Sequence, residues 1–174
     1  MSARSRKAAA GGGDELRVAV RVRPFNARET GAGASKLCVA MNGKVTTITD
    51  TTGIKAPRSF TYDYSYWSHD GYKQTKDGVF KGETGKYASQ EMVFEDLGKG
   101  MLDNAWIGYN AALFAYGQTG SGKTHTMLGD ENDPGIIPRV GKDLIHEMER
   151  TRGKTAFKIT ASKWCKAVPV FLFW

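Results

Sequence analysis

The chain has 174 residues, of which 40% are hydrophobic and 25% are charged, and its formal net charge at pH 7 is +7. This length and composition fit one globular domain with an apolar core and exclude a chain too polar to fold. No apolar run approaches the roughly 18 residues of a membrane-spanning helix, so we expect no membrane span.

The positive charge is concentrated at the two ends of the chain. Residues 1–13 carry three basic residues and residues 150–174 carry six, with no acidic residue in either segment. Basic ends can bind an acidic polymer, but solvated tails are the commoner reason, and we expect no nucleic-acid partner. Cys38 and Cys165 form no metal or redox spacing, and no signal peptide is visible, which favours a reducing, cytoplasmic location.

The N-terminal third predicts a leader followed by short strands. Residues 1–13 have little apolar content and are expected to be a disordered basic, glycine-rich leader. Apolar residues then alternate from Leu16 to Val22, which predicts a strand that Pro24 ends. Arg21 and Arg23 lie on the polar face of this strand, either as a solvated face or facing a ligand.

Three further segments follow before the first long helix. Residues 37–41 and 44–49 flank Asn42-Gly43, which favours a type I′ hairpin turn. Residues 60–66 are aromatic and β-prone and predict another strand. Residues 68–86 lack periodicity and are expected to form a long surface loop.

Residues 89–106 carry an apolar stripe with helical spacing, which predicts a core-facing helix. Residues 110–116 are mostly apolar and short enough for a buried strand, with parallel pairing expected. Beyond Met127, residues 129–135 form a polar loop whose acids could bind a cation but are expected to be solvated. A second amphipathic helix follows, with Pro138 in its first turn, and residues 157–160 begin a further strand.

A glycine-rich motif lies between the predicted strand 110–116 and a helix start. It matches G-x-x-x-x-G-K-[ST] and comprises Gly117, Gln118, Thr119, Gly120, Ser121, Gly122, Lys123 and Thr124. Glycines let successive backbone N–H groups approach phosphate oxygens, and the helix N-terminus favours a negative group. Lys123 can contact the β- and γ-phosphates, and the Thr124 hydroxyl can bind Mg²⁺. The alternative is a flexible glycine-rich surface turn.

Helix, strand, phosphate loop and helix follow one another in the order of an α/β protein. The predicted fold is a P-loop NTPase with a mixed, largely parallel sheet flanked by helices, incomplete at its C-terminal side.

Four separated segments together resemble a kinesin motor domain. They are residues 21–26 (RVRPFN), 62–67 (YDYSYW), 108–110 with 114–127 (GYN and FAYGQTGSGKTHTM), and 135–138 (GIIP). The resemblance runs from about Leu16 to Thr160 and covers roughly the first half of such a motor, so we expect a motor-like region at 14–160. Residues 63–69 (DYSYWSH) are similar to the kinesin-three transport branch.

This resemblance implies an ATP-driven microtubule motor on the cytoskeleton, with ATP and Mg²⁺ as ligands. In the family, the segment equivalent to Arg21, Arg23 and Pro24 sits against the adenine, and His125 stacks on its other side. Cationic and imidazole planes are physically reasonable partners for a purine. The sites expected here are therefore the phosphate loop, these four residues, and Thr124 for the metal.

The resemblance also places two switch segments, which orient the attacking water and hold Mg²⁺, beyond the matched region. No catalytic residue is assigned here, and the chain is expected to be inactive as an ATPase. Residues 161–174 are expected to be a divergent tail that is not native to the fold. Two alternatives stay open: a truncated, non-catalytic nucleotide-binding remnant, and an unrelated P-loop ATPase.

Overall fold

The computed structural model describes residues 16–31, 35–152 and 158–160. The expected leader at 1–13 and the expected tail at 161–174 lie outside these residues. The elements in chain order are β1 (Ala19–Val22), α1 (Ala27–Gly31), β2 (Val39–Asn42), β3 (Val45–Ile48), β4 (Arg58–Thr61), β5 (Tyr64–Trp67), β6 (Tyr72–Gln74), β7 (Phe80–Gly82), α2 (Gln90–Val93), the π-helix η1 (Phe94–Gly98), α3 (Lys99–Trp106), α4 (Lys123–Met127) and α5 (Ile136–Arg150).

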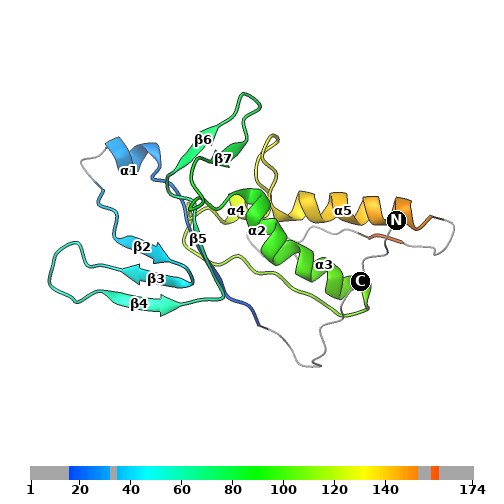
Figure 1. The fold of residues 1–174 in the computed structure, drawn as a ribbon, viewed down its shortest axis with the longest axis horizontal. Coiled ribbons are helices and arrows are strands. Elements are labelled where there is room, and N and C mark those ends of the chain that lie inside the picture. The colour runs from blue at the N-terminus through cyan, green and yellow to red at the C-terminus, as the bar shows by residue number, and fades with distance from the viewer. Residues whose placement is uncertain (1–15, 32–34, 153–157, 161–174) are drawn as a thin grey trace.

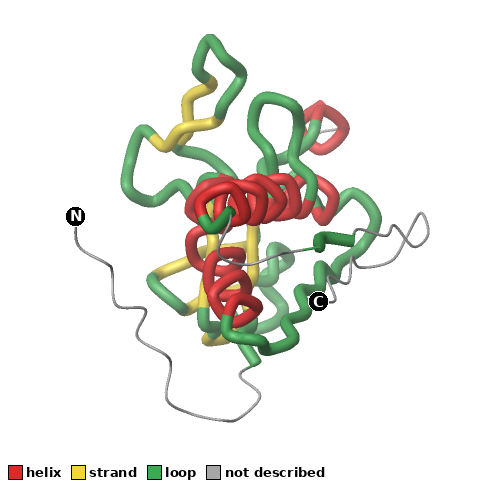
Figure 2. Tube along the Cα trace, turned by 90° about the vertical axis from the view of Figure 1, so that its right-hand side faces the viewer, coloured by secondary structure: helices red, strands yellow, loops and turns green. Residues whose placement is uncertain are grey.

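The described strands form both parallel and antiparallel ladders, in three separate sheets and not in one mixed sheet. β1 pairs in parallel with β5, and β2, β3 and β4 form an antiparallel sheet in that order. In Figure 1 this second sheet extends to one side of β5, while α2, α3 and α5 lie on the other side. Figure 2 shows the same helices stacked in front of the strands.

The predicted strand 60–66 is wrong as a single element, because β4 and β5 belong to different ladders. Between them, the Tyr62 amide donates to the carbonyl of Lys44 at 3.0 Å, while the Asp63 amide donates to the carbonyl of Val18 at 3.0 Å. The Asp63 carboxylate also accepts from the Val18 amide at 2.8 Å. The chain therefore changes partner within two residues.

Two turn predictions need correction. Asn42 pairs with Val45, so the turn of the first hairpin consists of Gly43, whose φ is 56°, and Lys44, one residue later than expected. Residues 68–86 are not an unstructured loop, since they contain the β6–β7 hairpin. Its strands have only three residues each, too few to produce a periodic pattern.

The helix predicted at 89–106 is confirmed as the continuous run α2, η1 and α3. Ser89 caps its start, where the Ser89 Oγ accepts from the Met92 amide at 3.1 Å. The predicted apolar stripe faces the core, which also receives one face of α5. The buried members of this core are Tyr66, Ala88, Val93, Phe94, Leu102, Ile136, Val140 and Leu144.

Residues 110–116 do not form the predicted strand, since no ladder among the described residues includes them. Their side chains still alternate: Leu113 packs against the core, whereas Phe114 is 61% exposed. A strand needs a hydrogen-bonded neighbour, and a cavity separates this segment from β1. Residues 158–160 are likewise not in a strand, and Phe157 lies outside the described residues.

Within the described part of the chain, no helix is long and apolar enough to cross a membrane.

The core contribution of α5 can be tested with two isoleucines of the same helix. Ile136 is 2% exposed, whereas Ile145, further along α5, is 56% exposed. Ile136→Ala should lower the free energy of unfolding by about 2–5 kcal/mol, because it removes buried methyl groups and leaves a cavity. Ile145→Ala should cost less than about 1 kcal/mol. Equal losses in urea unfolding would contradict this placement of the core.

Candidate phosphate-loop site

The backbone of residues 117–122 has the shape that a phosphate loop requires. Gly117, Gly120 and Gly122 have positive φ angles of 151°, 79° and 97°. A Cβ atom at Gly117 would lie 2.5 Å from the Ser121 Oγ, so a larger residue there would require Ser121 to move. The Ser121 amide donates to the carbonyl of Gln118 at 3.1 Å, which closes the turn.

Lys123 and Thr124 follow the loop as the first residues of α4. The Lys123 Nζ donates to the carbonyls of Gly117 and Gln118, at 2.8 and 2.9 Å. The ammonium group is thus held against the loop backbone, and Thr124 is exposed beside it. A cation next to a glycine loop and a hydroxyl is a donor set suited to phosphate oxygens.

Arg23 lies directly against this loop. Its Nε donates to the carbonyl of Gly120 at 2.8 Å, and its two terminal nitrogens donate to the Glu29 carboxylate at 2.7 and 2.8 Å. Arg23 also donates to the carbonyl of Pro24. The bidentate ion pair holds the Arg23 side chain in one orientation, so β1 and the loop are linked through it.

Arg21 points elsewhere, although it lies only two residues earlier in the chain. Its partly buried guanidinium donates to the Ser68 Oγ at 2.9 Å, the Gln90 Oε1 at 2.7 Å and the Thr126 Oγ1 at 3.2 Å. Burial lowers the pKa of Arg21. The structure therefore joins Arg21 to α2 and α4, whereas it places Arg23 at the phosphate loop.

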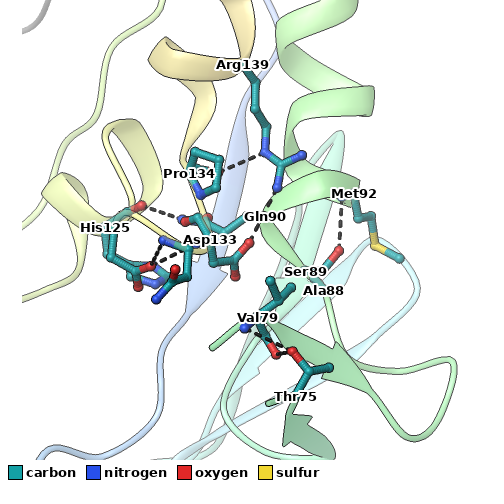
Figure 3. A network of polar contacts seen from close by, with 12 residues as sticks. Thr75, Val79, Ala88, Ser89, Gln90, Met92, His125, Asp133, Pro134 and Arg139 are labelled. Atoms are coloured by element: carbon teal, nitrogen blue, oxygen red, sulfur yellow. Dashed lines mark hydrogen bonds and ion pairs between the residues drawn. The ribbon is translucent and has the colours of Figure 1, made fainter. Parts of the chain in front are cut away.

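Gln90 is a residue of this site that sequence reasoning missed. It is 1% exposed, and its Nε2 donates to the carbonyl of His125 at 2.6 Å (Figure 3). Its Oε1 accepts from Arg21. The Nε2 also lies 3.5 Å from the carbonyl of Asp133. The only signal in the sequence was a polar side chain immediately after the N-cap Ser89, which is common at helix starts.

The expectation that the acidic residues of loop 129–135 are solvated is wrong for Asp133. Its side chain is only 3% exposed, and its Oδ1 lies 3.4 Å from the Arg139 Nη2. Burial raises the pKa of Asp133, and the Arg139 guanidinium opposes that rise. Asp130, in contrast, is exposed and its Oδ1 accepts from the Asn132 and Asp133 amides. The loop is therefore folded against the protein.

One cavity of about 480 Å³ brings most of the predicted site residues together. Its lining includes Arg21, Arg23, Pro24, Ser121, Gly122, Lys123 and His125. Burial, followed by the charge of Arg21, lowers the pKa of His125, so its imidazole is biased toward the neutral form. The volume is in the usual range for a small-molecule site.

The Arg23–Glu29 ion pair yields a pH prediction. Hydrogen bonds from Arg23, and then from the Asn26 amide, lower the pKa of Glu29 from 4.5 to about 2. Because the folded value lies below the unfolded value, the stabilisation is present above about pH 4.5 and is lost as the pH falls through about 2. NMR titration of the Glu29 carboxyl should show this low pKa.

Arg23→Gln should return the pKa of Glu29 toward 4.5, because it removes the first cause of the shift. Arg28→Gln, at a neighbouring arginine outside this ion pair, should leave the pKa low. A Glu29 pKa near 4.5 in the unsubstituted chain would show that Arg23 is not held as described.

Comparison with known proteins agrees with this geometry. The family model for the kinesin motor domain matches residues 21–164. Kinesin-like protein KIF28 of Rattus norvegicus is 48% identical over 80% of this chain and 14% of its own length. Kinesin-like protein KIF1C of Homo sapiens is 46% identical over 80% of this chain and 12% of its own length.

A solved structure described as KIF14 with ADP, in complex with a microtubule, matches with a TM-score of 0.69 and 43% identity. The match covers 80% of this chain and 35% of that one. This chain therefore spans only a small part of its full-length relatives and about a third of the solved motor. An unrelated P-loop ATPase is excluded, and the predicted P-loop NTPase fold is confirmed. The chain belongs to the kinesin motor domain family.

Proposed function

We propose that this chain binds ATP with Mg²⁺ at the phosphate loop and supplies the nucleotide-binding part of a microtubule motor. The observation that carries the proposal is the Lys123 ammonium held against the carbonyls of Gly117 and Gln118. The same loop contains three glycines with positive φ, and Lys123 lines the cavity of about 480 Å³. An anionic ligand with several oxygens fits this combination better than a neutral one.

Within the loop, we assign the phosphate contacts to the Lys123 ammonium and to the backbone amides of residues 117–122 other than that of Ser121, which donates to the carbonyl of Gln118. We assign Gln118 and Thr119 a role through their backbone groups and not their side chains. They lie in the turn that the hydrogen bond from the Ser121 amide to the Gln118 carbonyl closes. Thr124 would hold Mg²⁺ together with phosphate oxygens. No group of three His, Cys, Asp or Glu side chains that could hold a metal occurs among the described residues, so a metal here would depend on the phosphates for most of its ligands. When bound, Mg²⁺ neutralises phosphate charge.

For the base, we assign direct contact to Arg23, Pro24 and His125, which line the cavity next to the loop. Arg21 was expected to share this role. Because its donors are engaged with Ser68, Gln90 and Thr126, we assign it the task of positioning α4, which carries His125. Arg23 would then contact the base directly, whereas Arg21 would act on the ligand only through the position of α4.

Motor activity in this lineage is supported by the family assignment and by the KIF14 structure described as a complex with a microtubule. We accordingly propose a cytoskeletal location and microtubules as the partner of the protein. The second candidate is a nucleotide-binding chain that does no mechanical work. The observation favouring it is that the described residues offer phosphate-loop groups but no assigned group that orients water.

Lys123→Ala tests the site assignment. It should weaken MgATP binding about 100-fold or more, which removes the calorimetric signal, because it deletes the charged donor of the loop. Lys142→Ala, at an exposed lysine on α5, is the matched control and should leave binding unchanged. Equal affinity of the Lys123→Ala variant and the unsubstituted chain would refute the assignment.

A steady-state phosphate-release assay separates the two candidate functions. The 174-residue chain should show no stimulation by polymerised microtubules, because the resemblance assigns the water-orienting group and the second Mg²⁺ carboxylate to segments beyond the matched region. These effects are worth several kcal/mol of the barrier. A complete kinesin motor domain serves as the positive control. Measurable stimulation of this chain would overturn the prediction and exclude the second candidate.

A further inference from the structure

The cavity beside the phosphate loop continues to a group of aromatic rings that the proposed function does not use. Tyr72 of β6, Phe80 of β7 and Tyr87 line the same cavity as Lys123 and His125. The Tyr72 and Phe80 rings meet edge to face with centroids 5.2 Å apart, and the Tyr72 and Tyr87 rings lie 5.0 Å apart. The cavity therefore has a charged part and an aromatic part.

The aromatic part is held in place by the β6–β7 hairpin. Tyr72 pairs with Gly82 and Gln74 pairs with Phe80 in the ladder, and the Glu83 amide donates to the carbonyl of Gly71 at 2.9 Å. Tyr87 is 7% exposed, and its buried ring supports the Tyr72 ring that packs against it. The rings are consequently ordered before any ligand binds, which lowers the entropic cost of contact.

The hairpin is also packed against the loop that follows α4. A Cβ atom at Gly78 would lie 2.9 Å from the Asn132 Nδ2, so the hairpin turn touches loop 129–135. Figure 1 shows the hairpin and this loop projecting on the same side of the molecule, and Figure 3 places Thr75 and Val79 near Asp133. The contact between the hairpin turn and loop 129–135 thus helps to hold the aromatic rings in place relative to α4 and His125.

We propose that the β6–β7 hairpin supplies an aromatic subsite for the nucleotide base, with Tyr72 and Phe80 as the residues that contact it. The inference rests on the proposed function, because the Lys123 end of the cavity takes the phosphates and the aromatic end is left for a flat, largely apolar group. The half-buried Tyr72 and Phe80 rings line the cavity and present aromatic surface on which a purine can stack. His125, lining the same cavity, adds a third planar group.

The competing interpretation is that these rings only hold the hairpin together. The two interpretations differ in what a substitution at Tyr72 does to ligands with and without a base. A packing role would change the stability of the chain and affect both ligands alike. A base-contacting role would affect only the ligand that carries the base.

The experiment compares MgATP with magnesium tripolyphosphate, which has the phosphates but no base, by titration calorimetry on the 174-residue chain. Tyr72→Leu keeps apolar volume but removes the π-face, and it should weaken MgATP about five-fold or more while tripolyphosphate affinity changes less than about two-fold. Tyr72→Phe keeps the ring and should retain MgATP affinity. Phe80→Leu should behave as Tyr72→Leu does.

Tyr109→Leu is the matched control, because Tyr109 is 61% exposed and is not part of the cavity lining. It should leave both affinities unchanged. Equal weakening of both ligands by Tyr72→Leu, or no weakening of either, overturns the aromatic subsite while Lys123→Ala still tests the phosphate loop separately. Failure of the unsubstituted chain to bind either ligand overturns the proposed function and this inference together.

Discussion

The position of α4, the helix that follows the phosphate loop, depends on the hydrogen bonds of one partly buried guanidinium, that of Arg21. A cation that leaves water loses hydration, and it is tolerated when its donors are satisfied. Arg21 meets this condition by donating to Ser68, Gln90 and Thr126, which come from three different parts of the chain. Because Thr126 belongs to α4, the same interaction sets where the helix after the loop lies.

The loop itself is held from two sides. Arg23 donates a hydrogen bond to the carbonyl of Gly120 in the loop, and the ion pair with Glu29 orients the Arg23 side chain. On the other side, Gln90 accepts from Arg21 and donates to the carbonyl of His125. Arg21 on β1 and Arg23 just after this strand therefore act at different places, Arg23 at Gly120 in the loop and Arg21 at Thr126 in α4. In a regular strand, two residues separated by one would lie on the same face, so the end of β1 after Val22 allows Arg23 to take a different direction.

The features that could be predicted from the sequence are those encoded by neighbouring residues. The motif ending in Lys123-Thr124 is local, and so is the helix after Ser89, whose apolar spacing reflects one continuous core face. The missed features depend on distant partners. Gln90 is joined to the site through Arg21 and His125, 69 and 35 residues away, and the Asp133 carbonyl lies against the Gln90 amide, 43 residues away.

The predictions for residues 110–116 and for the β6–β7 hairpin were wrong in opposite ways, for one physical reason. Residues 110–116 alternate in burial but pair with no strand among the described residues. The hairpin strands pair with each other, but their sequence shows no alternation of apolar and polar residues. Side-chain alternation reports which face meets the core, whereas pairing reports whether another strand lies about 5 Å away. Composition constrains the alternation and says little about the pairing, which is why the hairpin that borders the cavity could not be predicted from residues 68–86.

The hairpin is connected to the phosphate loop through α4, which is short. The helix has five residues, and its last turn is continuous with loop 129–135, where the Gly129 amide donates to the carbonyl of Thr124 at 3.2 Å and the Gly135 amide to that of Leu128 at 2.9 Å. A Cβ atom at Gly129 would clash with the backbone of Asp133, so a side chain does not fit at this position. The hairpin turn at Gly78 packs against Asn132 of the same loop. A chain of packed segments therefore joins the hairpin to the helix that carries Lys123 and His125.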